Sequence, residues 1–148
     1  MSFLKNKKCS NQINGLVETE LDPYHDNRGE IWTLFNHRDW PAQFLEDKIS
    51  ISCKNVLRGL HGDHTTHKLI SCLSGEFYLA VADARPSSPT YGNIETFIVS
   101  SNQPKLIFVP AGCLNGHLSL TKQCIFWYKW SENYKGPQNQ VTCKWNDK

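Results

Sequence analysis

Three side chains suited to proton transfer, Arg58, His61 and Lys68, lie within eleven residues of one another. A histidine titrates near neutral pH and can remove a proton, and two neighbouring cations can stabilise the negative charge that results. Abstraction of a proton next to a carbonyl group needs this combination. The segment that contains it runs from Asn55 to Arg85 and continues into an apolar pattern typical of a strand.

The elements that must position these residues are short, apolar and separated by turns. Turn signals such as Ser74-Gly75 and Pro110-Ala111-Gly112 recur at short spacing along the chain. Many short strands with regular turns favour an all-β fold, and a double-sheet jelly roll, the double-stranded β-helix of cupins, fits best. The expected strands are 30–35, 48–53, 68–72, 76–83, 94–100, 105–109, 116–120 and 124–130.

Helical and disordered segments are expected to be few. Residues 37–45 are the one helix-like stretch, and Pro41 limits them to a turn or two. Residues 1–12 are polar enough to be partly disordered. A length of 148 residues predicts a single domain over residues 1–148 with a substantial core.

The composition narrows the class of protein. A net charge of +2 is too small to indicate a nucleic-acid partner. Six cysteines include no Cys-x-x-Cys pair, and the chain begins MSFLKNKK without an apolar signal segment, so we expect reduced thiols in a cytoplasmic protein. No apolar run approaches the roughly 20 residues that span a bilayer, and no membrane association is expected.

Six motifs occur in an order and spacing that resemble one family. They are Arg58-Gly59-Leu60-His61, Lys68-Leu69 leading into Ser74-Gly75, Asp83-Ala84-Arg85, Ser88-Pro89-Thr90-Tyr91-Gly92, Phe108-Val109-Pro110-Ala111-Gly112 and Tyr128-Lys129. Together they resemble the dTDP-4-dehydrorhamnose 3,5-epimerase family from about residue 26 to residue 147. The resemblance implies a cupin-type jelly roll, usually a homodimer, which acts on nucleotide-diphosphate-linked 4-keto-6-deoxy sugars without a metal or other cofactor.

The chemistry of such a sugar sets the requirements for a site. The 4-keto group acidifies the hydrogens on C3 and C5, so a base can remove one of them and leave an enolate, and reprotonation from the opposite face inverts the carbon. By resemblance His61 is the base, and Lys68 and Arg58 lie near the oxyanion and the sugar or phosphate oxygens. The acid on the other face corresponds to Tyr128.

The resemblance also suggests ligand contacts away from the reacting carbon. The turn Asp26–Gly29 matches one whose arginine, Arg28 here, contacts the nucleotide, often in the neighbouring subunit. Lys48 stands where the family carries an amide side chain, and it can bind phosphate as a point charge. Tyr134 matches a tyrosine that lines the sugar pocket. Asn115 takes the place of a second pocket histidine, and His67 is expected at the pocket edge.

A metal site is not expected from the histidines. His61, His64 and His67 are three residues apart, whereas metal-binding cupins typically combine a His-x-His pair with a carboxylate and a later histidine. Asn115 stands at the position of that later histidine, and His117 could replace it only if the strand register shifted by two. We expect His64 to lie on a surface turn.

The support of His61 departs from the family pattern. Family members generally orient this histidine with a carboxylate from a C-terminal segment, whereas this chain ends at Trp145-Asn146-Asp147-Lys148. Leu79 stands where a second carboxylate is common, and Asp63 is close in sequence but on the same turn. We therefore expect no carboxylate behind His61, a loss that would weaken control of its tautomer and basicity.

Three functions agree with these residues. The first is epimerisation at C3 and/or C5 of a nucleotide-linked 4-keto-6-deoxy sugar, for bacterial surface polysaccharides such as lipopolysaccharide or capsule. The others are a 3,4-ketoisomerase that uses the same enolate and a non-catalytic jelly-roll protein that binds sugar nucleotides. The sequence Arg28–Thr33 and the short turn at His61 further resemble a branch that processes GDP-linked 4-keto-6-deoxy-heptoses.

Overall fold

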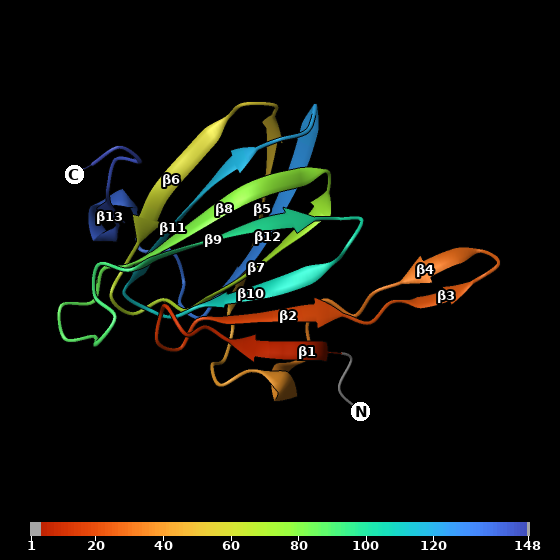
Figure 1. The fold of residues 1–148 in the computed structure, drawn as a ribbon, viewed down its shortest axis with the longest axis horizontal. Coiled ribbons are helices and arrows are strands. Elements are labelled where there is room, and N and C mark those ends of the chain that lie inside the picture. The colour runs from red at the N-terminus through yellow and green to blue at the C-terminus, as the bar shows by residue number, and fades with distance from the viewer. Residues whose placement is uncertain (1–3, 148) are drawn as a thin grey trace.

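The computed structural model describes residues 4–147, which form two packed antiparallel sheets and a projecting hairpin (Figure 1). In this range the larger sheet has the order β1-β2-β10-β7-β12-β5, and the other has the order β13-β6-β11-β8-β9. The strands are β1 (Leu4–Cys9), β2 (Val17–Leu21), β3 (Tyr24–Asp26), β4 (Gly29–Ile31), β5 (Glu46–Cys53), β6 (Leu57–Gly62), β7 (Lys68–Ser74), β8 (Glu76–Asp83), β9 (Ile94–Ser100), β10 (Lys105–Val109), β11 (Cys113–Ser119), β12 (Gln123–Trp130) and β13 (Val141–Thr142).

Strands with strong apolar alternation were predicted well. β8, β9 and β10 have the predicted bounds, and β5, β7, β11 and β12 overlap their predictions. The prediction of a strand over 30–35 was wrong beyond β4, because that segment leaves the hairpin after Ile31. The strands β1, β2, β3, β6 and β13 were not predicted, since they are short or contain few apolar residues.

The segments predicted to be disordered or helical form a short strand and a single 3-10 turn. Residues 4–9 form β1 along the edge of the larger sheet, so the expectation of disorder over residues 1–12 is wrong for them; residues 1–3 lie outside the described part. The helix-like stretch 37–45 contains a single 3-10 turn, η1 (His37–Asp39), which agrees with the prediction of at most a turn or two before Pro41. A second 3-10 turn, η2 (Pro137–Asn139), precedes β13.

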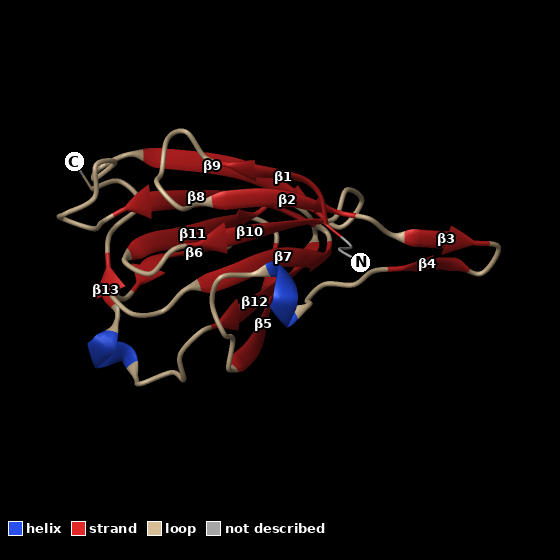
Figure 2. Ribbon diagram, turned by 90° about the horizontal axis from the view of Figure 1, so that it is seen from below, coloured by secondary structure: helices blue, strands red, loops and turns tan. Residues whose placement is uncertain are grey.

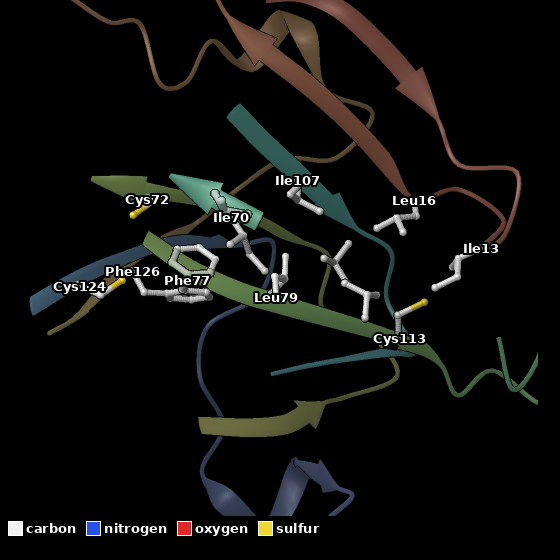
Figure 3. Packing of buried hydrophobic residues seen from close by; sticks show 13 residues of the cluster. Ile13, Leu16, Ile70, Cys72, Phe77, Leu79, Ile107, Cys113, Cys124 and Phe126 are labelled. Atoms are coloured by element: carbon white, nitrogen blue, oxygen red, sulfur yellow. The ribbon is translucent and has the colours of Figure 1, made fainter. Parts of the chain in front are cut away.

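The space between the two sheets holds the main core. Phe77, Leu79 and Val81 alternate inward on β8, where they pack against Ile70 and Phe126 of the larger sheet (Figure 3). Alternation with period two places every second residue of β8 on this inner face. Leu79, which stands where the family carries a carboxylate, is fully buried in this apolar layer.

A second cluster covers the outer face of the larger sheet. The connection between β4 and β5 carries η1 across this face (Figure 2). There Trp40 stacks on Phe108 with 5.8 Å between the ring centroids, and Phe44 meets the same ring edge-on. Because this face is closed by aromatic side chains, the larger sheet can bind a ligand on its inner face. Residues of β5 and β12 line a cavity there together with residues of β6 and β11.

A bulge in β6 brings Arg58 and His61 to the same side of the strand. In a regular strand residues three apart face opposite sides, but here Asn115 pairs with His61 and His117 pairs with Arg58, so β6 contains one extra residue. Gly59 lies in this bulge with φ +118, and a Cβ there would lie 2.4 Å from the Cα of Gly116. A glycine is therefore required between these two predicted site residues.

Within residues 4–147 no helix is long and apolar enough to cross a membrane. The six cysteines, all within these residues, are free thiols, of which Cys72, Cys113 and Cys124 are buried.

Candidate active site

A cavity of about 710 Å³ lies between β5 and β12 of one sheet and β6 and β11 of the other. It combines apolar rings from β12 with cations and amides from several strands. Seven of the predicted site residues line it: Lys48, Arg58, His61, Lys68, Asn115, Tyr128 and Tyr134. Residues from the C-terminal segment, among them Gln140 and Thr142, complete the wall.

Lys68 is a buried cation at the first position of β7. Its Nζ donates to the carbonyl oxygen of His61 at 3.0 Å and to Oδ1 of Asn115 at 2.7 Å, and it lies 5.5 Å from the ring centroid of Trp130. Burial lowers the pKa of Lys68 to about 8, although the charge of Asp63 opposes this shift. The two oxygen acceptors are neutral, so the charge of Lys68 is available to an anion in the cavity.

His61 is held from the C-terminal side by a hydroxyl group. Nδ1 lies 3.1 Å from Oγ1 of Thr142, which pairs with His61 across β6 and β13. Burial and the positive charge of Lys68 lower the pKa of His61, so the ring is neutral and able to accept a proton near pH 7. The sequence did not reveal Thr142, because a two-residue strand has no periodicity to detect.

Asp63 does not support His61. Its Oδ1 accepts hydrogen bonds from the backbone N–H groups of Thr65 and Thr66, and its Oδ2 accepts from Nε2 of Gln140 at 3.0 Å. This carboxylate therefore closes the turn after β6 and anchors the C-terminal segment beside the cavity. No carboxylate among residues 4–147 is hydrogen-bonded to the His61 ring.

Tyr128 lies on the opposite sheet from His61. It is half-buried on β12, between the rings of Phe126 and Trp130, whose centroids are 5.1 and 6.1 Å away. Burial raises the pKa of Tyr128, against the opposing effect of Lys48 and other cations, so the phenol keeps its proton at neutral pH. A ligand between the sheets would have a neutral imidazole on one side and a phenol on the other.

Lys48 and Tyr134 form the outer end of the cavity together with Trp130. The Lys48 Nζ lies 4.7 Å from the ring centroids of both Trp130 and Tyr134, positions that allow cation–π attraction. Glu46 holds this group in place, because its carboxylate accepts from Lys48 Nζ at 2.6 Å and from the backbone N–H of Tyr134 at 2.7 Å. Glu46 is therefore a support for Lys48.

Arg58 and an unpredicted histidine, His117, also line the cavity. Arg58 donates through Nε to the hydroxyl of Ser52 at 3.0 Å. His117 lies beside it on β11, stacked on Phe126 with 4.0 Å between the ring centroids, and its buried Nε2 has no hydrogen-bond partner among residues 4–147. Residues 115 and 117 share one face of β11, so His117 reaches the cavity without the register shift that the sequence analysis required.

His67 was predicted at the pocket edge and does not line the cavity. Its ring stacks on Phe108 at 5.4 Å on the outer face of the larger sheet, and its Nδ1 accepts from the backbone N–H of Ala111 at 3.1 Å. The alternation of β7 explains this error, because the residue before the inward-facing Lys68 points the other way. His64 is exposed, as predicted.

Arg28 is also distant from this cavity within its own chain. It lies at the turn of the β3–β4 hairpin, which projects from the body of the molecule, and its guanidinium pairs with Asp26 at 2.5 Å (Figure 1). Its side chain is 81% exposed and so is accessible to a second molecule. Among residues 4–147 no group of three His, Cys, Asp or Glu side chains is arranged to hold a metal ion.

Comparison with known proteins identifies the family. The sequence model of the dTDP-4-dehydrorhamnose 3,5-epimerase family matches residues 10–148. The chain is 31% identical over 145 residues to the dTDP-4-dehydrorhamnose 3,5-epimerase of Escherichia coli K12, covering 92% of this chain and 78% of that protein.

Solved structures agree with this match. The epimerase of Legionella pneumophila, crystallised in complex with dTDP-4-keto-L-rhamnose, is 31% identical, with a TM-score of 0.88 over 96% of this chain and 79% of its own. The epimerase of Elizabethkingia anophelis has the same TM-score at 28% identity, over 99% of this chain and 83% of its own. The predicted cupin jelly roll is confirmed by these neighbours. The chain therefore belongs to the dTDP-4-dehydrorhamnose 3,5-epimerase family.

Proposed function

We propose that this protein epimerises a nucleotide-linked 4-keto-6-deoxy sugar at C3 and/or C5, for the synthesis of bacterial surface polysaccharides. The observation that carries this proposal is the placement of His61 and Tyr128 on opposite sheets of one cavity, with the buried cation of Lys68 beside them. Inversion of a carbon needs a base on one face and an acid on the other, and these two side chains meet that requirement.

Proton removal is assigned to His61. The neutral imidazole takes a proton from C3 or C5 through Nε2, the electron pair of the broken C–H bond forms a double bond to C4, and the carbonyl π electrons move to the C4 oxygen. Lys68 stabilises the enolate that results. Because Lys68 is desolvated and its other acceptors are neutral oxygens, its charge acts on the oxyanion with little screening.

Proton return is assigned to Tyr128. Its phenol donates a proton to the opposite face of the same carbon while the C4 carbonyl re-forms, so the configuration inverts. The tyrosinate is then reprotonated and His61 is deprotonated through solvent, which returns the site to its starting state. Because its pKa is raised, the Tyr128 phenol stays protonated at neutral pH and can act as the acid.

Other residues of the cavity are assigned to binding. We assign Arg58 and Lys48 to the diphosphate and sugar oxygens, and Asn115 to the orientation of Lys68, from their positions along the cavity. Tyr134 covers the outer end. The relatives' dTDP ligands support a nucleotide-sugar ligand here.

The projecting hairpin supports a proposal about the nucleotide and the assembly. We propose a cytoplasmic homodimer in which Arg28 of one copy contacts the nucleotide bound to the other, because Arg28 is exposed at the tip of a projecting hairpin. The Arg28–Thr33 motif further supports a GDP-linked 4-keto-6-deoxy-heptose as the substrate. Calorimetry with GDP and dTDP on wild type and Arg28→Ala tests both points: the preferred nucleotide should lose affinity in the variant.

Solvent deuterium exchange tests the reaction itself. In D₂O the enzyme should incorporate deuterium at C3 or C5 of a supplied nucleotide 4-keto-6-deoxy sugar, with the ketone still at C4 in the product. His61→Asn should abolish exchange, and Tyr128→Phe should permit exchange while slowing inversion. If the protein binds such sugars without exchange, it is a binding protein; a ketone found at C3 would identify a ketoisomerase.

A further inference from the structure

The hydroxyl group of Thr142 is the one side-chain hydrogen-bond partner of the His61 ring among residues 4–147. The contact is built by the backbone: Val141 and Thr142 pair with Gly62 and His61, and Leu60 and Cys143 exchange two backbone hydrogen bonds of 3.0 Å. Directly paired residues of antiparallel strands place their side chains on the same face. The C-terminal strand therefore holds Oγ1 at Nδ1 across 81 residues of sequence.

A hydroxyl and a carboxylate control a histidine in different ways. A carboxylate accepts hydrogen bonds and carries a charge, so it places the ring proton on Nδ1, leaves Nε2 as the base and raises the pKa. A threonine hydroxyl is neutral and both donates and accepts. Among residues 4–147 the Thr142 hydroxyl has no second partner that would fix its direction.

We propose that Thr142 is the positioning residue of His61 and that, as a neutral two-way partner, it fixes the ring plane without fixing the tautomer. The inference rests on the proposed role of His61 as base and deepens it. The proton of the neutral ring can lie on Nδ1, donated to Oγ1, or on Nε2, with the hydroxyl donating to Nδ1. The first form is the one that can remove a substrate proton.

The charges around His61 also favour the neutral form of its ring. Among residues 4–147 no carboxylate lines the cavity, whereas cations and neutral titratable groups line it from both sheets. Lys68 bonds to the main chain of His61 itself. Burial and the charge of Lys68 lower the pKa of His61 and so disfavour an imidazolium, and the neutral Thr142 hydroxyl does not oppose them. The facing groups are Lys48 on β5, Arg58 on β6, Lys68 on β7, His117 on β11, Tyr128 on β12 and Tyr134 after it.

The test is an NMR titration of the full chain with ¹⁵N-labelled histidine, which reports the tautomer and pKa of His61 without any substrate. Wild type should show ring nitrogen shifts between those of the two pure tautomers. Thr142→Asp should move the proton to Nδ1 and raise the pKa of His61 by about one unit or more. Val141→Asp is the matched control, since it adds the same charge on the opposite face of β13.

Activity measurements connect the ring to the reaction. In the deuterium exchange assay Thr142→Val should lower the rate about tenfold or more and Thr142→Ser should restore most of it. In Thr142→Asp the acid limb of the pH–rate profile should move to higher pH, by the same amount as the pKa of His61 measured by NMR.

Two results would overturn the inference: a pure Nδ1–H tautomer in wild type, or equal His61 pKa values in Thr142→Asp and Val141→Asp. Absence of exchange in every variant, with the NMR changes present, would count against the proposed epimerase alone.

Discussion

At the scale of single residues, the cavity contains two buried basic side chains, Lys68 and His117. They differ in the polar partners that offset the cost of removing them from water. Lys68 keeps two oxygen acceptors and an aromatic ring around its ammonium group. His117 has a buried nitrogen without a partner, and burial, assisted by the charge of Arg58, lowers its pKa to about 4. Lys68 can therefore act as a cation, whereas His117 remains neutral at neutral pH.

The neutral state of His117 predicts a pH-dependent stability. Between the ordinary pKa of 6.5 and the folded value of about 4, the unfolded chain binds a proton that the folded ring does not. Stability should therefore fall as the pH is lowered through this range, by roughly 1.4 kcal/mol per pH unit from this group. His117→Phe should keep the stack on Phe126 and remove this part of the slope in urea unfolding between pH 4 and 7.

A surface histidine provides the control for that experiment. His64 is exposed, so His64→Gln should leave the pH dependence as in wild type. His117→Phe should also raise the free energy of unfolding by about 1 kcal/mol at pH 7, because it removes an unpaired buried nitrogen. An unchanged slope in His117→Phe would show that the ring is charged or hydrated when folded.

Lys68 predicts an alkaline limit of activity. Its pKa of about 8 means that the cation is lost as the pH rises through that value, and with it the stabilisation of the enolate. The deuterium exchange rate should fall above about pH 8 for this reason. Lys68→Met should lower the rate by about 10²-fold or more at pH 7, the magnitude typical for loss of one oxyanion donor. A Lys68→Met variant as fast as wild type would contradict the assignment.

At the scale of elements, the bulged strand β6 determines which side chains enter the cavity. It approaches β11 so closely that neither Gly59 nor Gly116 has room for a side chain without displacement. The extra residue in β6 then turns His61 inward beside Asn115, while Arg58 stays beside His117. The side chains of Arg58 and His61 both line the cavity because a backbone irregularity, and not strand periodicity, orients them.

Gly59→Ala should destabilise the protein by about 2 kcal/mol or more and abolish exchange, because the new Cβ clashes with the backbone of β11 at a positive φ. Gly29→Ala is the matched control, since Gly29 also has a positive φ, +130, but nothing lies within 4 Å of its Cβ position. Denaturant unfolding of both variants separates the clash from the backbone strain. Equal losses would contradict the close approach of β6 and β11.

At the scale of the whole molecule, one edge of the larger sheet is poorly protected. β5 is the last strand of that sheet, and Ile49 and Ile51 on its outer face are 59% and 57% exposed. An exposed apolar edge strand is prone to pair with another chain. This edge is consistent with the proposed homodimer, in which the Arg28 hairpin would reach a second copy.

Ile49→Lys combined with Ile51→Lys should therefore shift the protein from dimer to monomer, because two charges would be buried at the edge. Light scattering after gel filtration measures the mass, and calorimetry should show weaker nucleotide binding in the same variant. Tyr91→Lys, at an exposed position in the loop before β9, serves as the control. A wild-type chain that is monomeric at tens of micromolar would contradict the proposed assembly.

The all-β class, the bounds of β8, β9 and β10 and the residue types for enolate chemistry could be predicted from the sequence, because they depend on period-two alternation and short local motifs. Which side chains meet could not be predicted and became clear from the three-dimensional fold. Thr142 reaches His61 through a two-residue strand, His117 enters the cavity because it shares a face with Asn115, and His67 turns outward. Such contacts depend on strand pairing and a bulge between distant segments, and no local pattern encodes them.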